Sequence, residues 1–444
     1  MNYNFIKKTY EKIPKQIKYV CSSIFINKIV RNKIYKKMYS DLDEFERLSE
    51  MERIKKQFDL LKETLCYAYE KVPYYHELFD SISFQPQNMK TAEDIQKIPL
   101  LTKDIAINAD KNLLSSEQIS CYETVTGGSS GRALKVILDK DSIYKERAFV
   151  NHFLAKYGYD VRKHRTVAFW GHNKGADYYY SPLKNEIVIS PFKLFDENSF
   201  ENVWAAIEKF NPTFIAGYPS AIYLFSQLME QYKKKKTFNL IDFYAENYTP
   251  EIKAYCEKIL GCKAISNYGH TERAVFAEEY PKGYLFNDLY GYTEFLPTEN
   301  DGEYQIVCTG FISRKMPLIR YVTDDVVYFT EEGYAQILGH KFSEVCLISK
   351  TGGKIFKGAL TMHIDVLKKV QQYQYVQYEP GKAFLDLVLI ENLSENERRD
   401  IIEYLSQRCE GQLDIEIRIV DKVELTKRGK YNWAVNKIEN GNKK

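Results

Sequence analysis

The feature that most constrains the fold is an alternation of strand-like and helical runs between residues 120 and 340. Short apolar runs typical of buried strands stand at Val167–Trp170, Glu186–Ser190, Thr213–Ala216 and Lys263–Ser266. Longer segments with helical periodicity stand at Phe200–Phe210, Pro219–Tyr232 and Pro250–Leu260. Strands that alternate with helices form a mostly parallel sheet covered by helices. We therefore predict an α/β fold for this part of the chain.

Length and pattern divide the chain into three predicted parts, because 444 residues exceed one typical domain. We predict a basic, helical N-terminal segment at 1–48, a large domain at 49–338 and a small C-terminal α+β domain at 339–444. Apolar spacings of three and four predict helix over 41–80, with the pattern ending at Pro73. Closely spaced strands at 303–338 predict a β-rich subdomain. Beyond 341 the pattern is strand, helix, strand, helix, strand, with Val388–Ile390 and Ile415–Val420 as strands.

The first 40 residues carry ten lysines and arginines against one acid, Glu11, with apolar residues between them. Such a helix can lie on an anionic membrane surface or dock on a partner. The alternative, which we favour, is a helix packed on its own domain with its basic face in solvent. No apolar run reaches the ~18 residues of a membrane span, and no signal peptide is recognisable. We predict a cytoplasmic protein, with contact at the inner membrane face as the open alternative.

Charge and cysteine usage exclude several classes of protein. The net charge is only +3, and no basic stripe with interleaved aromatic residues follows the N-terminus, so we predict no nucleic-acid partner. The eight cysteines are scattered without a C-x-x-C pair. This spacing supports neither a disulfide framework nor a zinc site. A reducing compartment with mostly buried thiols is the simpler interpretation.

The first motif with chemical potential is a loop of glycines and hydroxyl residues. It reads Thr126-Gly127-Gly128-Ser129-Ser130-Gly131. Such a loop can direct N–H groups and hydroxyls at phosphate oxygens. It lacks the Lys-Ser or Lys-Thr ending of the P-loop, and alone it is equally well explained as a surface turn.

Three further motifs follow in the chain. Tyr268-Gly269-His270-Thr271-Glu272 comes just after an apolar run, at a strand end where open α/β sheets bind ligands. There Tyr268 offers a flat face for a base and Glu272 a hard oxygen for Mg²⁺; His270 is interpreted as a packing residue.

Asp325 follows a strand-like run and can bind ribose hydroxyls, or else close a hairpin turn. Gly429 precedes Lys430, a compact cation suited to a transferring phosphate, or else a solvated tail residue.

In this order the four motifs resemble the adenylate-forming superfamily of acyl-CoA synthetases, adenylation domains and luciferases. The closer resemblance is to its phenylacetate–CoA ligase branch and the CapK-like members associated with capsular polysaccharide biosynthesis. It covers roughly residues 50–435 and includes the segments Val72-Pro73-Tyr74-Tyr75, Ile98-Pro99-Leu100-Leu101, Gly217-Tyr218-Pro219 and Cys308-Thr309-Gly310. The resemblance implies an AMP-forming ligase that adenylates a carboxylic acid with ATP and Mg²⁺. The acceptor is CoA or an amine, possibly sugar-linked, and a homodimer is a further implication.

The resemblance also assigns roles to residues. Thr126 to Gly131 would hold the β- and γ-phosphates, Tyr268 with Gly269 the adenine, and Asp325 the ribose. Thr271 would contact the α-phosphate, and Glu272 would bind Mg²⁺. Lys430 would bridge carboxylate and α-phosphate, on a small domain that moves between the half-reactions. The acid would lie against parts of 147–220, for which Trp170, His172 and Tyr218 are the candidates.

Some positions depart from the family pattern. Ala133 replaces the usual proline after the phosphate loop, and Asp324 replaces the glycine before the ribose aspartate. The hinge Gly-Arg is replaced by Gly339-His340, and Tyr280 follows Glu279 where some relatives carry zinc cysteines, so we predict no structural metal. These departures leave a second hypothesis open, a degenerate nucleotide-binding relative that acts as a membrane-associated scaffold.

Overall fold

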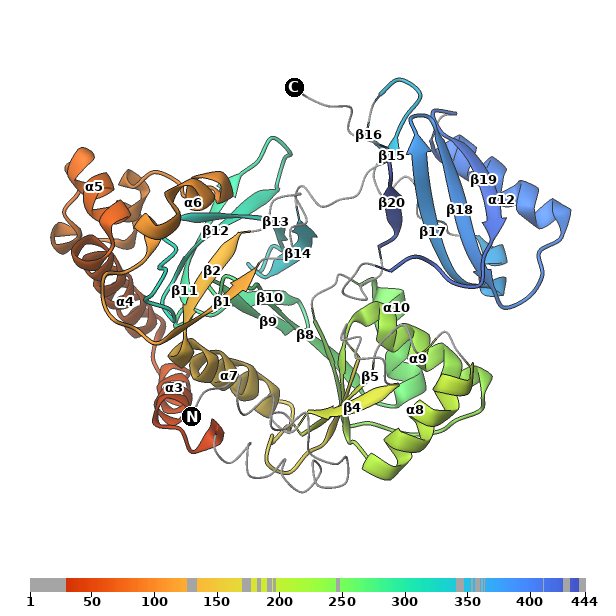
Figure 1. Ribbon diagram of the computed structural model, residues 1–444, viewed down its shortest axis with the longest axis horizontal. Helices are drawn as coiled ribbons and strands as arrows, with labels where there is room; N and C mark the ends of the chain where they lie inside the picture. Colours follow the sequence, from red (N-terminus) through yellow and green to blue (C-terminus); the bar gives the residue numbers. More distant parts are fainter. Residues whose placement is uncertain are drawn as a thin grey trace.

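The computed structural model describes residues 29–125, 134–169, 177–181, 185–189, 194, 197–244, 248–340, 347–352, 354–355, 360, 362, 364–409, 411–425 and 432–438. One long mixed sheet with helices packed against it forms the main body, and a smaller sheet lies near the C-terminus (Figure 1). The long sheet has twelve strands in the order β11-β12-β13-β14-β10-β9-β8-β7-β6-β3-β5-β4. This confirms the predicted α/β class with a large and a small unit.

Five parallel strands form the half of the sheet in which strands and helices alternate. They are β5 (Glu186–Ile189), β3 (Thr166–Phe169), β6 (Phe214–Gly217), β7 (Leu240–Phe243) and β8 (Lys263–Gly269), with β4 (Tyr178–Ser181) antiparallel at the edge. Three helices accompany them: α8 (Glu197–Phe210), α9 (Pro219–Gln231) and α10 (Pro250–Leu260). The four predicted strands and three predicted helices are confirmed, with bounds shifted by at most three residues.

Antiparallel strands form the other half, which begins earlier in the chain than the β-rich region predicted at 303–338. They are β9 (Phe276–Tyr280), β10 (Gly283–Phe286), β11 (Gly291–Pro297), β12 (Tyr304–Gly310), β13 (Tyr321–Phe329) and β14 (Ala335–His340). The two halves meet at β8, which is parallel to β7 and antiparallel to β9. β14 continues two residues past the predicted boundary at 338, so Gly339 and His340 belong to a strand of the large sheet. Residues 341–346, the rest of the predicted hinge, lie outside the described residues.

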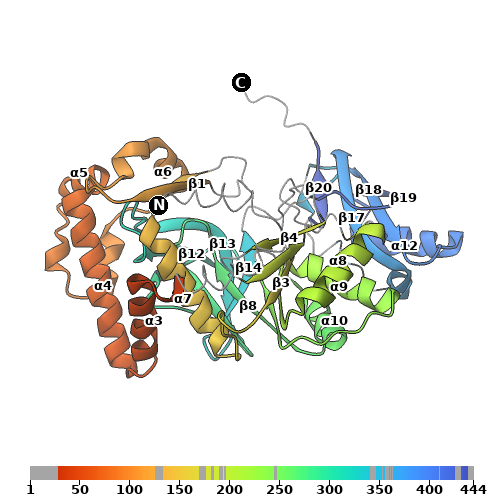
Figure 2. The same ribbon diagram turned by 60° about the horizontal axis from the view of Figure 1, so that its bottom comes forward.

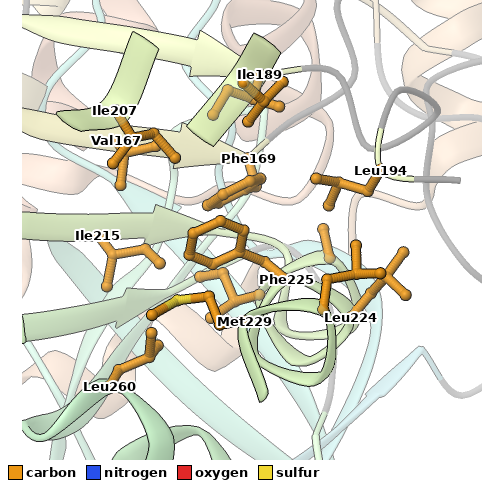
Figure 3. Close-up of a cluster of buried hydrophobic side chains, with 14 of the residues drawn as sticks. Val167, Phe169, Ile189, Leu194, Ile207, Ile215, Leu224, Phe225, Met229 and Leu260 are labelled. Carbon is orange, nitrogen blue, oxygen red and sulfur yellow. The ribbon is translucent and has the colours of Figure 1, made fainter. Parts of the chain in front are cut away.

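The parallel half has a core on each face because strand side chains alternate in direction. On β7, Ile241 and Phe243 pack in the cluster that α8, α9 and α10 close. Figure 3 shows part of this cluster around Phe169 and Phe225, whose ring centroids lie 4.7 Å apart. On the other face, Leu240 packs with residues of α3 (Lys33–Phe45) and α7 (Lys140–Ala155).

The N-terminal region adds helices that pack on α7 and on the antiparallel half. These are α3, α4 (Glu50–Lys71), α5 (Pro73–Ser81) and α6 (Lys103–Ala109), with 3₁₀ turns at Pro86–Asn88, Ala92–Lys97 and Asp110–Leu113. Figure 2 shows α3, α4 and α7 grouped at one end of the body and α8 to α10 at the other. Pro73 ends α4, as predicted, but it also begins α5, because the first residue of a helix needs no N–H partner.

Helix α3 packs on α7, so residues 33–45 follow the packed-helix interpretation. Its Leu42 and Phe45 are buried, and Asn151 Nδ2 on α7 donates to Tyr35 Oη at 3.1 Å. The basic residues of 1–28, on which the membrane alternative depended, lie outside the described residues. Within the ranges that the structure describes, we find no helix both long and apolar enough to cross a bilayer.

The C-terminal unit is a four-stranded sheet in the order β19-β18-β17-β20. Its elements are β15 (Leu347–Ile348), β16 (Lys354–Ile355), a 3₁₀ turn at Asp365–Lys369, β17 (Val370–Glu379), β18 (Lys382–Leu389), α12 (Glu395–Arg408), β19 (Asp414–Ile419) and β20 (Ala434–Asn436). The predicted middle strand is a hairpin of two, β17 and β18. The unit lies beside α8 to α10 in both views, and Gln227 Nε2 of α9 donates to Gln371 O of β17 at 3.5 Å (Figures 1 and 2).

Candidate functional site

The motif that begins at Tyr268 lies at the carboxyl end of the parallel strands. β8 continues to Gly269, three residues beyond the predicted strand end at Ser266. Tyr268 and Gly269 are therefore its last two residues, and His270 to Glu272 form the turn that follows. Because β5, β3, β6, β7 and β8 are parallel, their carboxyl ends share one edge of the sheet. Ligands of open α/β sheets bind along this edge.

Tyr268 and Asp325, both predicted to contact the nucleoside, touch each other. The Tyr268 hydroxyl donates to Oδ2 of Asp325, a residue of β13, at 2.6 Å. Asp325 is only 5% exposed. Burial raises the pKa of the Tyr268 phenol, and the adjacent Asp325 charge raises it further, so the phenol stays protonated as the donor. Two side chains 57 residues apart thus form one polar contact at the strand edge.

Glu272 forms a buried ion pair with His270, which was predicted only to pack. His270 Nδ1 lies 3.2 Å from Glu272 Oε2, without hydrogen-bond geometry, and the Tyr321 hydroxyl donates to Glu272 Oε1 at 3.1 Å. Burial alone would raise the pKa of Glu272, but the His270 charge outweighs it and lowers the pKa to about 2. Burial alone would lower the pKa of His270, whereas the Glu272 charge holds it well above its usual value.

Cys308 of β12 completes the buried surroundings of His270. Its Sγ lies 3.8 Å from His270 Nε2, and burial raises the pKa of the thiol. The imidazolium therefore lies between a carboxylate and a protonated thiol. Sequence reasoning missed this arrangement because its members come from the turn after β8 and from β12 and β13.

Arg273 links the same turn to the hairpin of β1 (Cys121–Val125) and β2 (Lys135–Asp139). Its guanidinium lies 5.8 Å from the Tyr122 ring centroid, and Nη1 donates to Ser142 Oγ at 3.0 Å. Val125 pairs with Lys135 across the hairpin. The connection between these strands contains the predicted phosphate loop, Thr126 to Gly131, which lies outside the described residues. Arg273, which follows Glu272 in the chain, thus contacts the hairpin that carries the loop.

The candidate acyl-contact residues are described only in part. Tyr218 directly follows β6, is 7% exposed, and its ring centroid lies 6.2 Å from that of Tyr244, which follows β7. Trp170, His172 and the candidate catalytic Lys430 lie outside the described residues. Thr271 is partly exposed in the turn after β8.

A buried carboxylate at the same edge, Asp242 of β7, was not predicted. It is 9% exposed and accepts a hydrogen bond from Asn267 Nδ2 at 3.1 Å. Its signal in the sequence is a charged residue inside the apolar run Leu240–Phe243, in a strand that also went unrecognised.

A second buried ion pair, between Arg320 and Glu294, lies directly before Tyr321 in the chain. Arg320 donates through Nη2 to Glu294 Oε1 at 2.8 Å and through Nε to Oε2 at 3.0 Å. Its Nη1 also donates to the carbonyl oxygens of Gln96 and Ile98. Both charged side chains are below 10% exposed. Arg320 therefore ties the segment before α6 to β11 and to the start of β13, immediately before Tyr321.

Comparisons with known proteins agree with this architecture. The CapK C-terminal domain model matches residues 347–437. The chain is 24% identical to protein CapK of Staphylococcus aureus, over 92% of this chain and 96% of that protein. It is 26% identical to phenylacetate-coenzyme A ligase of Escherichia coli K12, over 64% of this chain and 69% of that one.

Solved structures resemble it in fold. A 2-hydroxyisobutyryl-CoA ligase in the postadenylation state, in complex with R3-HIB-AMP, superposes with a TM-score of 0.66 at 15% identity. The match covers 88% of this chain and 90% of that one. The same ligase with 2-HIB-AMP and CoA in the thioesterification state superposes with a TM-score of 0.51 at 16% identity.

Proposed function

Because the chain is a CapK-like relative of the phenylacetate–CoA ligases within the adenylate-forming superfamily, we propose that it adenylates a carboxylic acid with ATP and transfers the acyl group to CoA or an amine. The substrate carboxylate oxygen attacks the α-phosphorus of ATP, and the bond to pyrophosphate breaks. A thiol or amine then attacks the acyl carbon of the mixed anhydride, and AMP leaves. The capsule association of CapK-like proteins supports a role in polysaccharide biosynthesis or modification.

The observation that carries this proposal is the contact between Tyr268 and Asp325 beside the ionised Glu272. Asp325 is a buried acceptor that two ribose hydroxyls can use once the Tyr268 hydroxyl turns away. The Tyr268 ring, at the end of β8, then offers its face to adenine. Arg273 contacts Tyr122 of the hairpin whose connection contains the Thr126–Gly131 loop, to which we assign the phosphates.

Mg²⁺ fits the site through Glu272. Among the described residues, no group of three or more histidines, cysteines, aspartates or glutamates gathers as a ligand set, so phosphate oxygens and water would supply the remaining ligands. When bound, the ion neutralises charge on the phosphates. Glu272 is already ionised and buried, and its present counter-charge is His270.

ATP–pyrophosphate exchange tests the proposal. The panel holds aryl acids, amino acids, fatty acids and uronic acids, each with Mg²⁺, and CoA or amines are added once an acid is active. Exchange that depends on one class of acid supports adenylation. ATP binding by calorimetry without exchange for any acid contradicts it and favours the non-catalytic scaffold.

Replacing Lys430 with Ala separates the two half-reactions. We expect adenylation to fall at least about 1,000-fold, because the cation that bridges the carboxylate and the α-phosphate is lost. Acyl transfer from a preformed adenylate should stay within about threefold of wild type, because no phosphate charge develops in that step. Exchange kinetics and single-turnover transfer measure the two rates. Lys427→Ala, three residues away, is the matched control, and equal loss of both half-reactions would contradict the role of Lys430.

A further inference from the structure

The hairpin of β1 and β2 forms a two-stranded sheet of its own, separate from the long sheet. Among the described strands, β1 and β2 pair with each other and with no other strand. The buried side chains of Val136 and Leu138 pack in one cluster with Met316 and Leu318. Apolar packing holds the hairpin against the core, but it is non-directional. Directional contacts are therefore needed to fix how the hairpin lies relative to the candidate site.

Asp139, the last residue of β2, makes such contacts. It is 5% exposed. Its Oδ1 accepts hydrogen bonds from Lys315 N at 2.7 Å and from Ser313 Oγ at 3.1 Å, and its Oδ2 accepts from Arg314 N at 2.8 Å. Hydrogen bonds from backbone N–H groups to a carboxylate are strong because the acceptor is charged. Asp139 therefore fixes the base of the hairpin to residues 313–315.

The chain beyond residue 315 leads to the candidate site and is held by buried hydrogen bonds of its own. The Tyr75 hydroxyl, which is buried, donates to Pro317 O at 3.0 Å and accepts from Ile319 N at 3.1 Å. Two residues later, the Tyr321 hydroxyl donates to Glu272 Oε1 at 3.1 Å. The segment that the Asp139 carboxylate holds is therefore continuous with the tyrosine that contacts Glu272.

A second connection starts from the backbone of Asp139. The Ser142 hydroxyl, which is fully buried, donates to Asp139 O at 2.6 Å and accepts from Arg273 Nη1 at 3.0 Å. Arg273 directly follows Glu272 in the chain. The base of the hairpin is thus connected to the surroundings of Glu272 by two routes, one through the Asp139 carboxylate and one through its carbonyl oxygen.

We propose that Asp139 is a positioning residue, which sets through the hairpin where the Thr126–Gly131 loop meets the β- and γ-phosphates of ATP. This inference rests on the proposed function, in which the loop binds those phosphates. β1 ends at Val125 and β2 begins at Lys135, and these two residues pair where the connection that contains the loop begins and ends. Backbone N–H groups bind phosphate only when they point at it together. A tilt of the hairpin at its base should therefore weaken the binding of ATP more than that of AMP, which lacks both phosphates.

Calorimetric binding of ATP and of AMP to the full chain, each with Mg²⁺, tests this, and wild type should bind ATP more tightly than AMP. Asp139→Asn keeps the shape of the side chain and removes its charge, and we expect it to weaken ATP at least about tenfold and AMP less than about twofold. Ser313→Ala removes one donor and leaves the charge, so it should weaken ATP by about threefold with the melting temperature near wild type. The matched control is Glu123→Gln on the same hairpin, whose exposed pair with Lys135 should leave both affinities unchanged.

The ratio of ATP affinity to AMP affinity separates positioning from stability. If Asp139 only stabilises the fold, Asp139→Asn lowers the melting temperature but keeps the wild-type ratio, which overturns the inference while adenylation stands. A reduced ratio supports the inference even if no acid gives pyrophosphate exchange, in which case only the catalytic proposal is overturned. If wild type binds ATP no more tightly than AMP, the assignment of phosphates to the loop and the inference are both overturned. If Asp139→Asn does not fold, the ratio in Ser313→Ala decides by the same criteria.

Discussion

Replacing Glu272 with Gln should lower pyrophosphate exchange at least about 100-fold, because the negative charge at the end of β8 is the predicted Mg²⁺ ligand. The amide oxygen of Gln keeps the acceptor for the Tyr321 hydroxyl, so the change removes charge with little change of shape. The apparent Mg²⁺ requirement, measured by titrating the ion at fixed ATP, should rise as well.

The fold should tolerate this change, since His270 can respond. Without the Glu272 charge, the largest cause that raises the pKa of His270 is gone, and burial favours the neutral imidazole. The melting temperature should therefore fall only modestly. Tyr321→Phe, which removes the hydroxyl but keeps the Glu272 charge, is the matched control and should cost less than about tenfold in exchange. Exchange by Glu272→Gln within threefold of wild type, at unchanged Mg²⁺ requirement, would remove Glu272 from the proposed machinery.

Replacing Arg320 with Met should destabilise the large domain by about 3–5 kcal/mol, because it leaves the Glu294 carboxylate buried without its counter-charge. The carbonyl oxygens of Gln96 and Ile98 lose their donor at the same time. A domain of this size should then melt at least about 6 °C lower in calorimetry.

Two further variants make the Arg320 result specific. The double variant Arg320→Met with Glu294→Leu removes both charges and should recover part of the loss, although the two carbonyls stay without their donor. Lys282→Met breaks a surface pair with Glu332, in which both side chains are more than half exposed, and should shift melting by about 1 °C or less. If Arg320→Met melts within 2 °C of wild type, the buried pair does not stabilise the domain as argued.

The fold could be predicted where local pattern decides it. The apolar runs at β3, β5, β6 and β8 are short and bounded, and the helices between them show regular spacing, so their positions follow from the sequence. The continuous twelve-stranded sheet could not be predicted, since β8 joins its halves through long-range pairing with both β7 and β9. β7 was missed because Asp242 interrupts its apolar run.

The candidate site likewise has residues that could be predicted from local motifs and contacts that could not. Tyr268, Glu272 and Asp325 could be proposed from their motifs and the family resemblance, and the structure places Tyr268 against Asp325. Their assigned roles stay predictions, as do those of Lys430 and the Thr126–Gly131 loop. The ion pair of His270 with Glu272 could not be predicted, because the charge of a histidine depends on burial and on neighbours brought in by other strands.

The end of β8 carries one more consequence, for which sequence changes this strand can tolerate during evolution. Asn267 and Tyr268 are consecutive, and consecutive strand residues face opposite sides, so one turns to Asp242 and the other to Asp325. A slip of one residue in β8 would exchange the two directions and abolish both contacts at once. Insertions or deletions in this strand would therefore break both contacts together. Substitutions at Tyr218 and Tyr244, which follow β6 and β7, leave the pairing of β8 untouched.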